Sequence, residues 1–252
     1  MSGRAVLVTG ASRGVGRAVA ARFAAGGDRV AVHHRDSAGL AEALVAELPG
    51  DGHVIVRGDL ADPAAVRSFV DAAADGLGGL DVLVNNAGVF LGAGRPHPVF
   101  GTGYDEWLAA WRGMIDVNLL GAANAAWCAA QHMRGRGGRI VNVSSRGAYR
   151  GEPDQPAYGA SKAALNAMGQ SLAVALAPYG IAVAGVAPGF VETDMTNEHL
   201  KAERGAAIRA QSPFGRVARP DEVAAAVHWL ASAEAEWASG AVLDLNGASY
   251  LR

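Results

Sequence analysis

The sequence predicts an α/β protein with a single-domain Rossmann fold, in which helices cover both faces of a doubly wound parallel sheet of about seven strands. Short apolar runs alternate along the chain with longer Ala-rich segments of helical character. The runs are apolar at most positions, as expected of strands that are buried on both faces. No Pro/Gly/Ser-rich linker and no step in composition divides the chain, so residues 1–252 are expected to form one domain.

Seven apolar runs supply the expected strands, and right-handed βαβ crossovers between them would give a parallel sheet. The runs span residues 5–8, 29–32, 53–57, 80–84, 139–143, 181–186 and 241–245. The expected helices include residues 16–25, 38–48, 63–75, 156–177 and 220–230. Pro63 and Pro220 lie where a helix begins without losing a needed N–H group. Two irregular stretches, residues 92–103 and 194–214, follow expected strand ends, at the edge where open α/β sheets bind ligands.

Composition and charge exclude several classes of protein. Half of the residues are hydrophobic and 18% are charged, which excludes a disordered chain. The formal net charge is −2 with no block of like charges, so neither a nucleic-acid partner nor a basic membrane face is expected. The most apolar long stretch is interrupted by prolines and glycines, whereas a spanning helix needs about 20 apolar residues. With one cysteine, Cys128, and no signal-peptide pattern, the protein is expected to be soluble and cytoplasmic.

A glycine-rich loop directly follows the first expected strand and opens the first expected helix. Its glycines are spaced G-x-x-x-G-x-G, one residue wider than the common dinucleotide fingerprint. Glycines allow a tight turn and a close approach of the backbone to a diphosphate, whose charge meets the helix N-terminus. A plain Gly-rich turn is the alternative, but the strand before and the helix after favour a dinucleotide site. The residues assigned to this site are Gly10, Ser12, Arg13, Gly14, Val15 and Gly16.

The end of the second expected strand indicates which dinucleotide is preferred. An acidic residue there would bind the ribose 2′-hydroxyl of NAD, and basic residues would suit the 2′-phosphate of NADP. The strand ends at His34, where the acid would be expected, and Arg35 follows it. Together with Arg13 in the loop, Arg35 could clamp a phosphate, since a guanidinium bonds two oxygens. The sequence therefore predicts NADP(H), although Asp36 beside Arg35 leaves NAD as an alternative.

Tyr158 and Lys162 are four residues apart and would share one face of an expected helix. A free tyrosine has a pKa of about 10, too high to cycle as acid and base near neutrality. A neighbouring cation favours the phenolate and lowers that pKa. Ser145 precedes Tyr158 by thirteen residues, follows the fifth expected strand, and could donate a hydrogen bond to a carbonyl oxygen. These three residues predict proton transfer at a carbonyl or alcohol group.

Together these motifs resemble those of the classical short-chain dehydrogenase/reductase family over nearly the whole chain. The resemblance extends to the branch that contains the 3-oxoacyl-acyl-carrier-protein reductases, whose motifs many sugar, steroid and polyketide reductases share. It implies an NADP(H)-dependent enzyme that interconverts a ketone and a secondary alcohol of a small molecule by hydride transfer. The matching pieces are residues 9–16, 59–60, 85–88 and 188–193 with Asn118, Ser145, Tyr158 and Lys162, and the tail from Arg216 carries the likeness to the branch.

The resemblance also implies a catalytic tetrad. Tyr158 would protonate the carbonyl oxygen during reduction, or take the hydroxyl proton during oxidation, while Ser145 polarises that oxygen. Lys162 would lower the pKa of Tyr158 and bind the nicotinamide ribose, and Asn118 would hold a water that links Lys162 to a proton relay. Lys162 stands out because twenty of the 22 basic residues are arginine.

For the cofactor, the resemblance implies contacts along its whole length. Asp59 and Leu60 would touch the adenine, and the segment from Asn86 to Gly88 would pass beside the adenosine ribose. The segment after the sixth strand would line the nicotinamide, with Thr193 near its carboxamide. The additional residues implied here are Asp59, Leu60, Asn86, Ala87, Gly88, Pro188, Gly189, Val191 and Thr193.

Two other interpretations remain open. One is an NAD-dependent alcohol dehydrogenase acting on a sugar, steroid or polyketide-type substrate, favoured if His34 and Arg35 face away from the cofactor. The other is a sensor or scaffold that binds NADP without turnover. The histidines show no metal-ligand spacing, so no metal is expected. The resemblance implies a homotetramer or dimer paired through residues 118–133 and 156–177, and a longer loop than usual at residues 92–103.

Overall fold

Seven parallel strands form one sheet in the order β3-β2-β1-β4-β5-β6-β7. The computed structural model describes residues 3–90, 96–193, 196 and 204–252. The strands are β1 (Ala5–Val8), β2 (Arg29–His34), β3 (Val54–Arg57), β4 (Val82–Asn85), β5 (Gly138–Val143), β6 (Ile181–Pro188) and β7 (Val242–Leu245). This arrangement confirms the predicted doubly wound Rossmann fold. The strand order reverses between β1 and β4, which places a ligand-binding crevice beyond their carboxyl ends.

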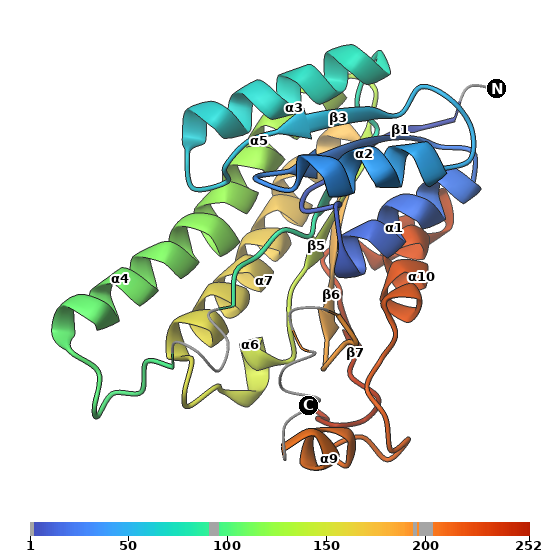
Figure 1. Ribbon diagram of the computed structural model, residues 1–252. Helices are drawn as coiled ribbons and strands as arrows, with labels where there is room; N and C mark the ends of the chain where they lie inside the picture. Colours follow the sequence, from blue (N-terminus) through green and yellow to red (C-terminus); the bar gives the residue numbers. More distant parts are fainter. Residues whose placement is uncertain (1–2, 91–95, 194–195, 197–203) are drawn as a thin grey trace.

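Helices cover both faces of this sheet (Figure 1). They are α1 (Gly14–Ala25), α2 (Ala38–Glu47), α3 (Pro63–Leu77), α4 (Tyr104–Ile115), α5 (Ala122–Met133), α6 (Gly147–Arg150), α7 (Pro156–Leu176), α9 (Arg204–Arg209) and α10 (Pro220–Leu230). A π-helical turn, Asp116–Gly121, joins α4 to α5 without a break in the helical path. Short 3₁₀ turns lie at Ala177–Tyr179 and Ala233–Ala238. Among the described helices, none is both long and apolar enough to cross a membrane.

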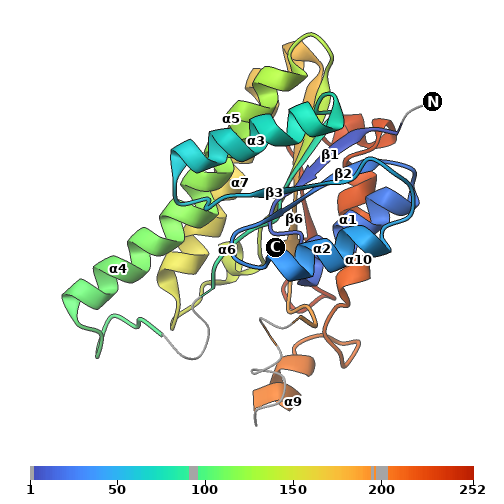
Figure 2. The ribbon, with the colours of Figure 1, turned by 45° about the horizontal axis from the view of Figure 1, so that its top comes forward.

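Two apolar cores, one on each face of the sheet, hold these layers together. Successive strand side chains point to opposite faces, so Val6 and Val8 enter the core shared with α1, α2 and α10. Leu7 enters the other core, which is built with α3, α5 and α7. Figure 2 shows α3, α5 and α7 on one side of the strands, with α1 and α10 on the other. Because both faces are covered, nearly all strand residues are apolar, which is the pattern from which the strands were predicted.

The element boundaries differ from the expected ones at a few positions. Helix α1 begins at Gly14 instead of residue 16, so two loop glycines belong to its first turn. The expected long loop at residues 92–103 is described only from residue 96, because residues 91–95 lie outside the described part of the chain. From there the chain has no helix or strand until α4 begins at Tyr104. His97 is buried in this segment, and its Nε2 accepts a hydrogen bond from the Ala157 N–H at 3.3 Å.

Candidate active site

The candidate active site lies beyond the carboxyl ends of the central strands, where loops distant in sequence converge. A Cβ added to Gly14 would lie 3.3 Å from Cγ2 of Thr193, so the loop after β1 faces the segment after β6. A Cβ added to Gly88 would lie 3.2 Å from Oδ1 of Asn118 and 3.3 Å from Nζ of Lys162. The segment after β4 therefore meets the π turn and α7. The structure thus brings Gly14 close to Thr193, and Gly88 close to Asn118 and Lys162.

The glycine loop after β1 forms a cradle that side chains would block. Gly10 and Gly14 have left-handed φ angles of 64° and 57°, a conformation that glycine adopts without strain. A Cβ on Gly16 would lie 2.3 Å from the carbonyl oxygen of Gly10. Neither a side-chain cap nor an acidic residue occupies the start of α1 among the described residues, so its first N–H groups face the loop. The cradle therefore fits an anionic diphosphate.

A buried histidine that the sequence analysis did not select holds this loop in place. The Nδ1 of His33 accepts a hydrogen bond from the Gly10 N–H at 3.0 Å, and its Nε2 lies 3.1 Å from the carbonyl oxygen of Gly58. Burial lowers the pKa of His33 to about 4, so the ring is neutral near pH 7 and Nδ1 remains an acceptor. Its ring packs against Phe69 at a centroid distance of 4.3 Å. The sequence offered no local signal, because this contact joins residues 23 positions apart.

The loop after β4 braces the glycine loop from the other side. The side-chain amide of Asn86 donates to the carbonyl oxygens of Thr9 at 2.9 Å and of Gly10 at 3.2 Å. The N–H groups of Asn86 and Ala87 both donate to the Thr9 hydroxyl at 3.0 Å. These contacts use the side-chain Nδ2 and the backbone N–H of Asn86 to fix the loop. The predicted place of Asn86 beside the adenosine ribose stays a prediction.

The two arginines predicted to bind a 2′-phosphate, Arg13 in the glycine loop and Arg35 after β2, differ in their protein contacts. Arg13 is exposed, and its guanidinium makes no ion pair or hydrogen bond with the described residues. The Nε of Arg35 lies 2.5 Å from Oδ2 of Asp36, and its Nη1 lies 3.9 Å from Oδ2 of Asp59. His34 is buried, and its Nδ1 has no hydrogen-bond partner among the described residues. The site thus offers an unpaired cation at Arg13 among the described residues, while two carboxylates compete for Arg35.

Three further residues predicted to contact the cofactor are held by protein packing. Leu60 is buried, and a Cβ on Gly121 would lie 2.6 Å from its carbonyl oxygen, so the loop after β3 packs on the π turn. Ser12 is buried within the glycine loop, and Val15 is half-buried on the first turn of α1. All three lie at the edge of the sheet where the site is expected.

Tyr158 lies on the first turn of α7 and is half-buried. The ring of Phe90 packs against it edge-on, with centroids 4.9 Å apart. Burial raises the pKa of Tyr158, the hydrogen-bonding interaction with the Ser145 hydroxyl lowers it, and the charge of Glu152 raises it. The net direction is upward, against the lowering expected from Lys162. The physical reason is that the loss of water around the phenolate outweighs the favourable interactions.

The structure distinguishes between the two serines that follow β5. The Ser144 hydroxyl is buried and donates to the carbonyl oxygen of Lys162 at 3.2 Å. The Ser145 hydroxyl accepts the Gly147 N–H at 3.0 Å and faces Tyr158. The Ser145 hydroxyl is therefore directed at the phenol, whereas the Ser144 hydroxyl is bound to the backbone of α7.

Lys162 is buried on α7, with 4% of its surface exposed. Its ammonium donates to the carbonyl oxygen of Val143 at 2.9 Å and lies 5.9 Å from the centroid of the Tyr158 ring. Burial lowers the pKa of Lys162 to about 8. None of the ion pairs in the described part of the chain includes this lysine. Its position suits a cation that is shared between the phenol and a bound hydroxyl group.

Asn118 lies in the π turn, a helical irregularity that is common at functional sites. Its Oδ1 accepts the Val89 N–H at 2.7 Å, and its Nδ2 donates to the Val89 carbonyl oxygen at 3.0 Å. Nδ2 also donates to the Ser161 hydroxyl at 3.1 Å. The side chain thus ties the loop after β4 to α7. The predicted contact of Asn118 with a relay water stays a prediction.

The segment after β6 forms the far wall of the site. Its backbone is anchored where the Gly189 N–H donates to the carbonyl oxygen of Leu245 at 3.1 Å. The carbonyl oxygen of Pro188 accepts the N–H of Arg146, the residue after Ser145, at 2.8 Å. Val191 forms a parallel bridge with Ala218. The segment predicted to line the nicotinamide is therefore fixed against both the serine strand and the tail of the chain.

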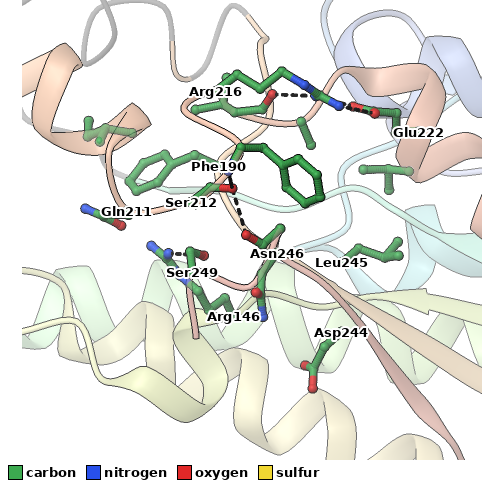
Figure 3. Close-up of a pocket in the computed structure, with 16 residues that line it drawn as sticks. Arg146, Phe190, Gln211, Ser212, Arg216, Glu222, Asp244, Leu245, Asn246 and Ser249 are labelled. Carbon is green, nitrogen blue, oxygen red and sulfur yellow. Dashed lines mark hydrogen bonds and ion pairs between the residues drawn. The ribbon is translucent and has the colours of Figure 1, made fainter. Parts of the chain in front are cut away.

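A cavity of about 320 Å³ adjoins this wall (Figure 3). Its lining includes Arg146, the neighbour of Ser145 in sequence, and Phe190, which follows Gly189. Arg146 was not among the site residues predicted from the sequence, and Phe190 was included only within the segment 188–193. The only feature of the sequence that could have pointed to Arg146 is its place directly after the candidate serine. Its burial could not be predicted, because it depends on contacts with the tail more than 100 positions away.

A protein-family model described as enoyl-(acyl carrier protein) reductase matches residues 10–247. An L-rhamnose 1-dehydrogenase (NAD(P)(+)) from Sphingomonas sp. (strain SKA58) is 37% identical over 256 residues, which cover 100% of this chain and 98% of the relative.

Two solved structures are similar over almost the whole chain. A short chain dehydrogenase from Burkholderia cenocepacia J2315 in complex with NADP has a TM-score of 0.87 and 37% identity, covering 98% of both chains. A 3-ketoacyl-(acyl-carrier-protein) reductase from Brucella melitensis complexed with NADH has a TM-score of 0.87 and 32% identity, covering 99% of both chains.

Proposed function

The chain belongs to the short-chain dehydrogenase/reductase family, and we propose that it is an NADP(H)-dependent reductase that interconverts a ketone and a secondary alcohol. Membership makes it an oxidoreductase that uses a nicotinamide cofactor on a small alcohol or carbonyl compound. One observation carries the proposal: Ser145 and Tyr158 face each other, and the buried Lys162 lies behind the phenol. The catalytic arrangement that we propose is like that of the 3-oxoacyl thioester reductases, the branch of the Brucella melitensis neighbour.

In this proposal the nicotinamide supplies or accepts the hydride, and the protein supplies the proton and the orientation. The hydroxyl of Ser145 donates a hydrogen bond to the substrate oxygen and polarises it. Tyr158 delivers its phenolic proton to that oxygen in the reductive direction, and takes it back in the oxidative one. Burial raises the pKa of Tyr158, so the phenol carries the proton that reduction needs, and the oxidative direction requires the charge of Lys162 to stabilise the phenolate.

Lys162 supports this proton transfer by holding a positive charge close to the phenolate that forms. Its ammonium has one protein acceptor, the carbonyl oxygen of Val143, among the hydrogen bonds of the described chain. The remaining donors suit the ribose hydroxyls of a bound cofactor. Asn118 positions the loop after β4 beside this lysine, and we propose that a water held at Asn118 returns a proton to the site.

The cofactor would follow the groove that these loops line. Its diphosphate fits the cradle of the glycine loop, and its adenosine end would lie between the ends of β2 and β3. Arg13 is free to reach a 2′-phosphate, which favours NADP(H). The nicotinamide would lie between Lys162 and Thr193, on the side where the segment after β6 is anchored.

A specific observation favours the NAD-dependent alternative. Arg35 is held by Asp36 at 2.5 Å, so it would have to break this ion pair to bind a 2′-phosphate. The Asp36 carboxylate is exposed and could instead accept a ribose hydroxyl. The cofactor preference thus depends on whether a phosphate competes successfully with Asp36 for Arg35.

A panel of carbonyl compounds, assayed with NADPH and with NADH, tests the proposed function. The panel contains acyl thioesters, sugars and polycyclic ketones, and we expect at least one to be reduced. The KM for NADPH should be at least about tenfold below that for NADH, because an arginine–phosphate contact is charge-assisted. Arg35→Gln should reduce the ratio of the KM for NADH to the KM for NADPH, whereas Arg112→Gln on the exposed face of α4 should leave this ratio unchanged. A clear NADH preference of the wild type would support the NAD alternative, and no turnover of any compound would support a sensor.

The reductive activity should fall above about pH 8 because Lys162 then loses its proton. Burial lowers the pKa of Lys162 to about 8, whereas the pKa of Tyr158 is raised, so the phenol is still protonated in this range. Lys162 carries its charge below this pH and is neutral above it. The measurement is kcat/KM for the cofactor between pH 6 and 10, which reports groups of the free enzyme. A profile that stays flat until the ordinary tyrosine pKa of about 10 would contradict the assignment.

Three broader expectations stay proposals. Residues 1–252 act as one unit, they associate as a homotetramer or dimer, and the enzyme works in the cytoplasm. Exposed apolar side chains on α5 and α7, among them Trp127 and Val174, support pairing through these helices.

A further inference from the structure

The cavity behind the segment after β6 combines an apolar interior with one buried cation. Its volume is about 320 Å³, at the lower end of the range for small-molecule sites. Phe190, Ile208 and Phe214 supply apolar walls. Arg146 enters from the side of the serine strand with only 4% of its surface exposed. In Figure 3, Arg146 and Ser249 lie on one wall, and the pair of Arg216 and Glu222 lies at the opposite end.

The charges around the cavity are balanced except for Arg146. Glu222 accepts two hydrogen bonds from Arg216, at 2.7 Å and 2.8 Å. Asp244 is paired with Arg252 at 2.9 Å. These pairs account for every other charged lining residue in the described part of the chain. Arg146 alone has no carboxylate within 4.0 Å among the described residues, so one positive charge faces the cavity without a counter-charge.

The protein partners of Arg146 leave most of its donors unused. Its Nη1 donates to the Ser249 hydroxyl at 2.6 Å, and the guanidinium lies over the Phe190 ring, 5.4 Å from the centroid. Burial lowers the pKa of Arg146, and the charge of Arg150 lowers it further, while Glu152 raises it without forming an ion pair. Removing a guanidinium from water is costly unless an anion compensates for the lost solvation. A planar fork of N–H donors is the usual protein partner of a carboxylate.

The cavity is close to the reacting groups along the chain. Arg146 directly follows Ser145, and its N–H is bonded to Pro188, at the start of the segment predicted to line the nicotinamide. Consecutive Cα atoms are about 3.8 Å apart. Ser145 and Tyr158 are not among the lining residues in the described part of the chain, so a substrate that reaches both Ser145 and Arg146 must span the step between these two neighbours.

We propose that Arg146 binds the carboxylate of the substrate, so that the enzyme acts on small keto acids or hydroxy acids with an apolar body. This inference rests on the proposed function and names the substrate class for the same site. The apolar walls would hold the carbon skeleton, and Arg146 would set its orientation so that the carbonyl group meets Ser145 and Tyr158. Neutral ketones of equal size would lack the compensating charge and would bind more weakly.

The test compares a keto acid with its neutral ester, using 4-oxocyclohexanecarboxylate and its methyl ester as substrates with NADPH. The wild type should prefer the acid in kcat/KM. Arg146→Gln should raise the KM for the acid at least about tenfold, because a charge-assisted pair is lost, and should change the KM for the ester less than about threefold. Arg146→Lys keeps the charge but not the fork, and should retain part of the preference. Arg112→Gln, which removes an exposed charge on α4, should leave the acid-to-ester ratio within about threefold.

A binding measurement separates this inference from the proposed function. Calorimetric titration with cyclohexanecarboxylate and with cyclohexanecarboxamide needs no turnover. We expect the acid to bind the wild-type protein, and to bind Arg146→Gln at least about tenfold more weakly, with the amide weak in both. Should the acid bind in this way while no ketone is reduced, the proposed function falls and the carboxylate site stands.

The opposite result is equally informative. If ketones are reduced but Arg146→Gln leaves the acid-to-ester ratio unchanged, the carboxylate site is wrong and the reductase stands. If Arg146→Gln fails to fold, as judged by circular dichroism, the acid-to-ester ratios of Arg146→Lys and of the wild type test the inference instead. A wild type that prefers the ester would then overturn the inference.

Discussion

Tyr158→Phe is expected to lower kcat by about 1000-fold while the affinity for NADPH stays within about twofold of wild type. The substitution removes one oxygen and keeps the ring that packs against Phe90, so the fold and the cofactor groove should persist. The lost oxygen is the proposed proton donor. Steady-state kinetics on the best carbonyl substrate measure the loss, and fluorescence titration with NADPH measures the binding.

A matched control for this variant is Tyr149→Phe. Tyr149 lies on α6, and its ring packs beneath Arg252 at 4.0 Å from the centroid. Tyr149→Phe removes the equivalent hydroxyl oxygen from a tyrosine nine residues away, and it should leave kcat within about threefold of the wild-type value. Undiminished turnover in Tyr158→Phe would falsify the proton-transfer role. If NADPH affinity and turnover were both lost, the result would instead indicate that the phenol maintains the structure of the site.

Lys162→Arg is expected to lower kcat/KM by about 100-fold or more, although it keeps the positive charge. Lys162 is almost fully buried, and its Nζ lies 2.9 Å from the Val143 carbonyl oxygen. A Cβ on Gly88 would already lie 3.3 Å from this Nζ, so little space remains for a broad guanidinium. Overpacking of this kind costs about 1–3 kcal/mol. The displaced charge would also meet the phenol and the ribose at different distances.

Lys201→Arg supplies the control, since position 201 is the only other lysine in the sequence. It should leave kcat/KM within about twofold. Thermal unfolding separates the two causes of the expected loss at position 162. A folded Lys162→Arg protein with near-normal turnover would show that any buried cation suffices, and would count against the proposed role of Lys162.

Much of the fold could be predicted from local patterns in the sequence. The seven strands lie within a few residues of the apolar runs, because a strand covered on both faces must be apolar at nearly every position. The start of α1 was placed two residues too late, since Gly14 and Val15 belong to its first turn. The π turn around Asn118 was not foreseen, because an insertion in a helix leaves the apolar spacing almost unchanged.

The candidate site also combines features that neighbouring residues predict with features that depend on distant parts of the chain. The glycine loop and the pair of Tyr158 and Lys162 were visible because their members are close in sequence and share one element. Their electrostatics were not visible. The pKa of Tyr158 is raised and that of Lys162 is lowered by burial, and burial depends on how the loops after β4 and β5 pack on α7.

The sequence by itself determined the alternation of strands and helices, the loop that cradles a diphosphate, and the spacing of the proton-transfer residues. Each of these is a short-range property of the chain, set by periodicity or by the turn of one helix. Only the tertiary structure placed His33 against Gly10, brought Arg35 within reach of Asp59, and buried Arg146 against Ser249. These contacts depend on strand order and on the path of the tail, because they join residues that are distant in sequence at one edge of the sheet.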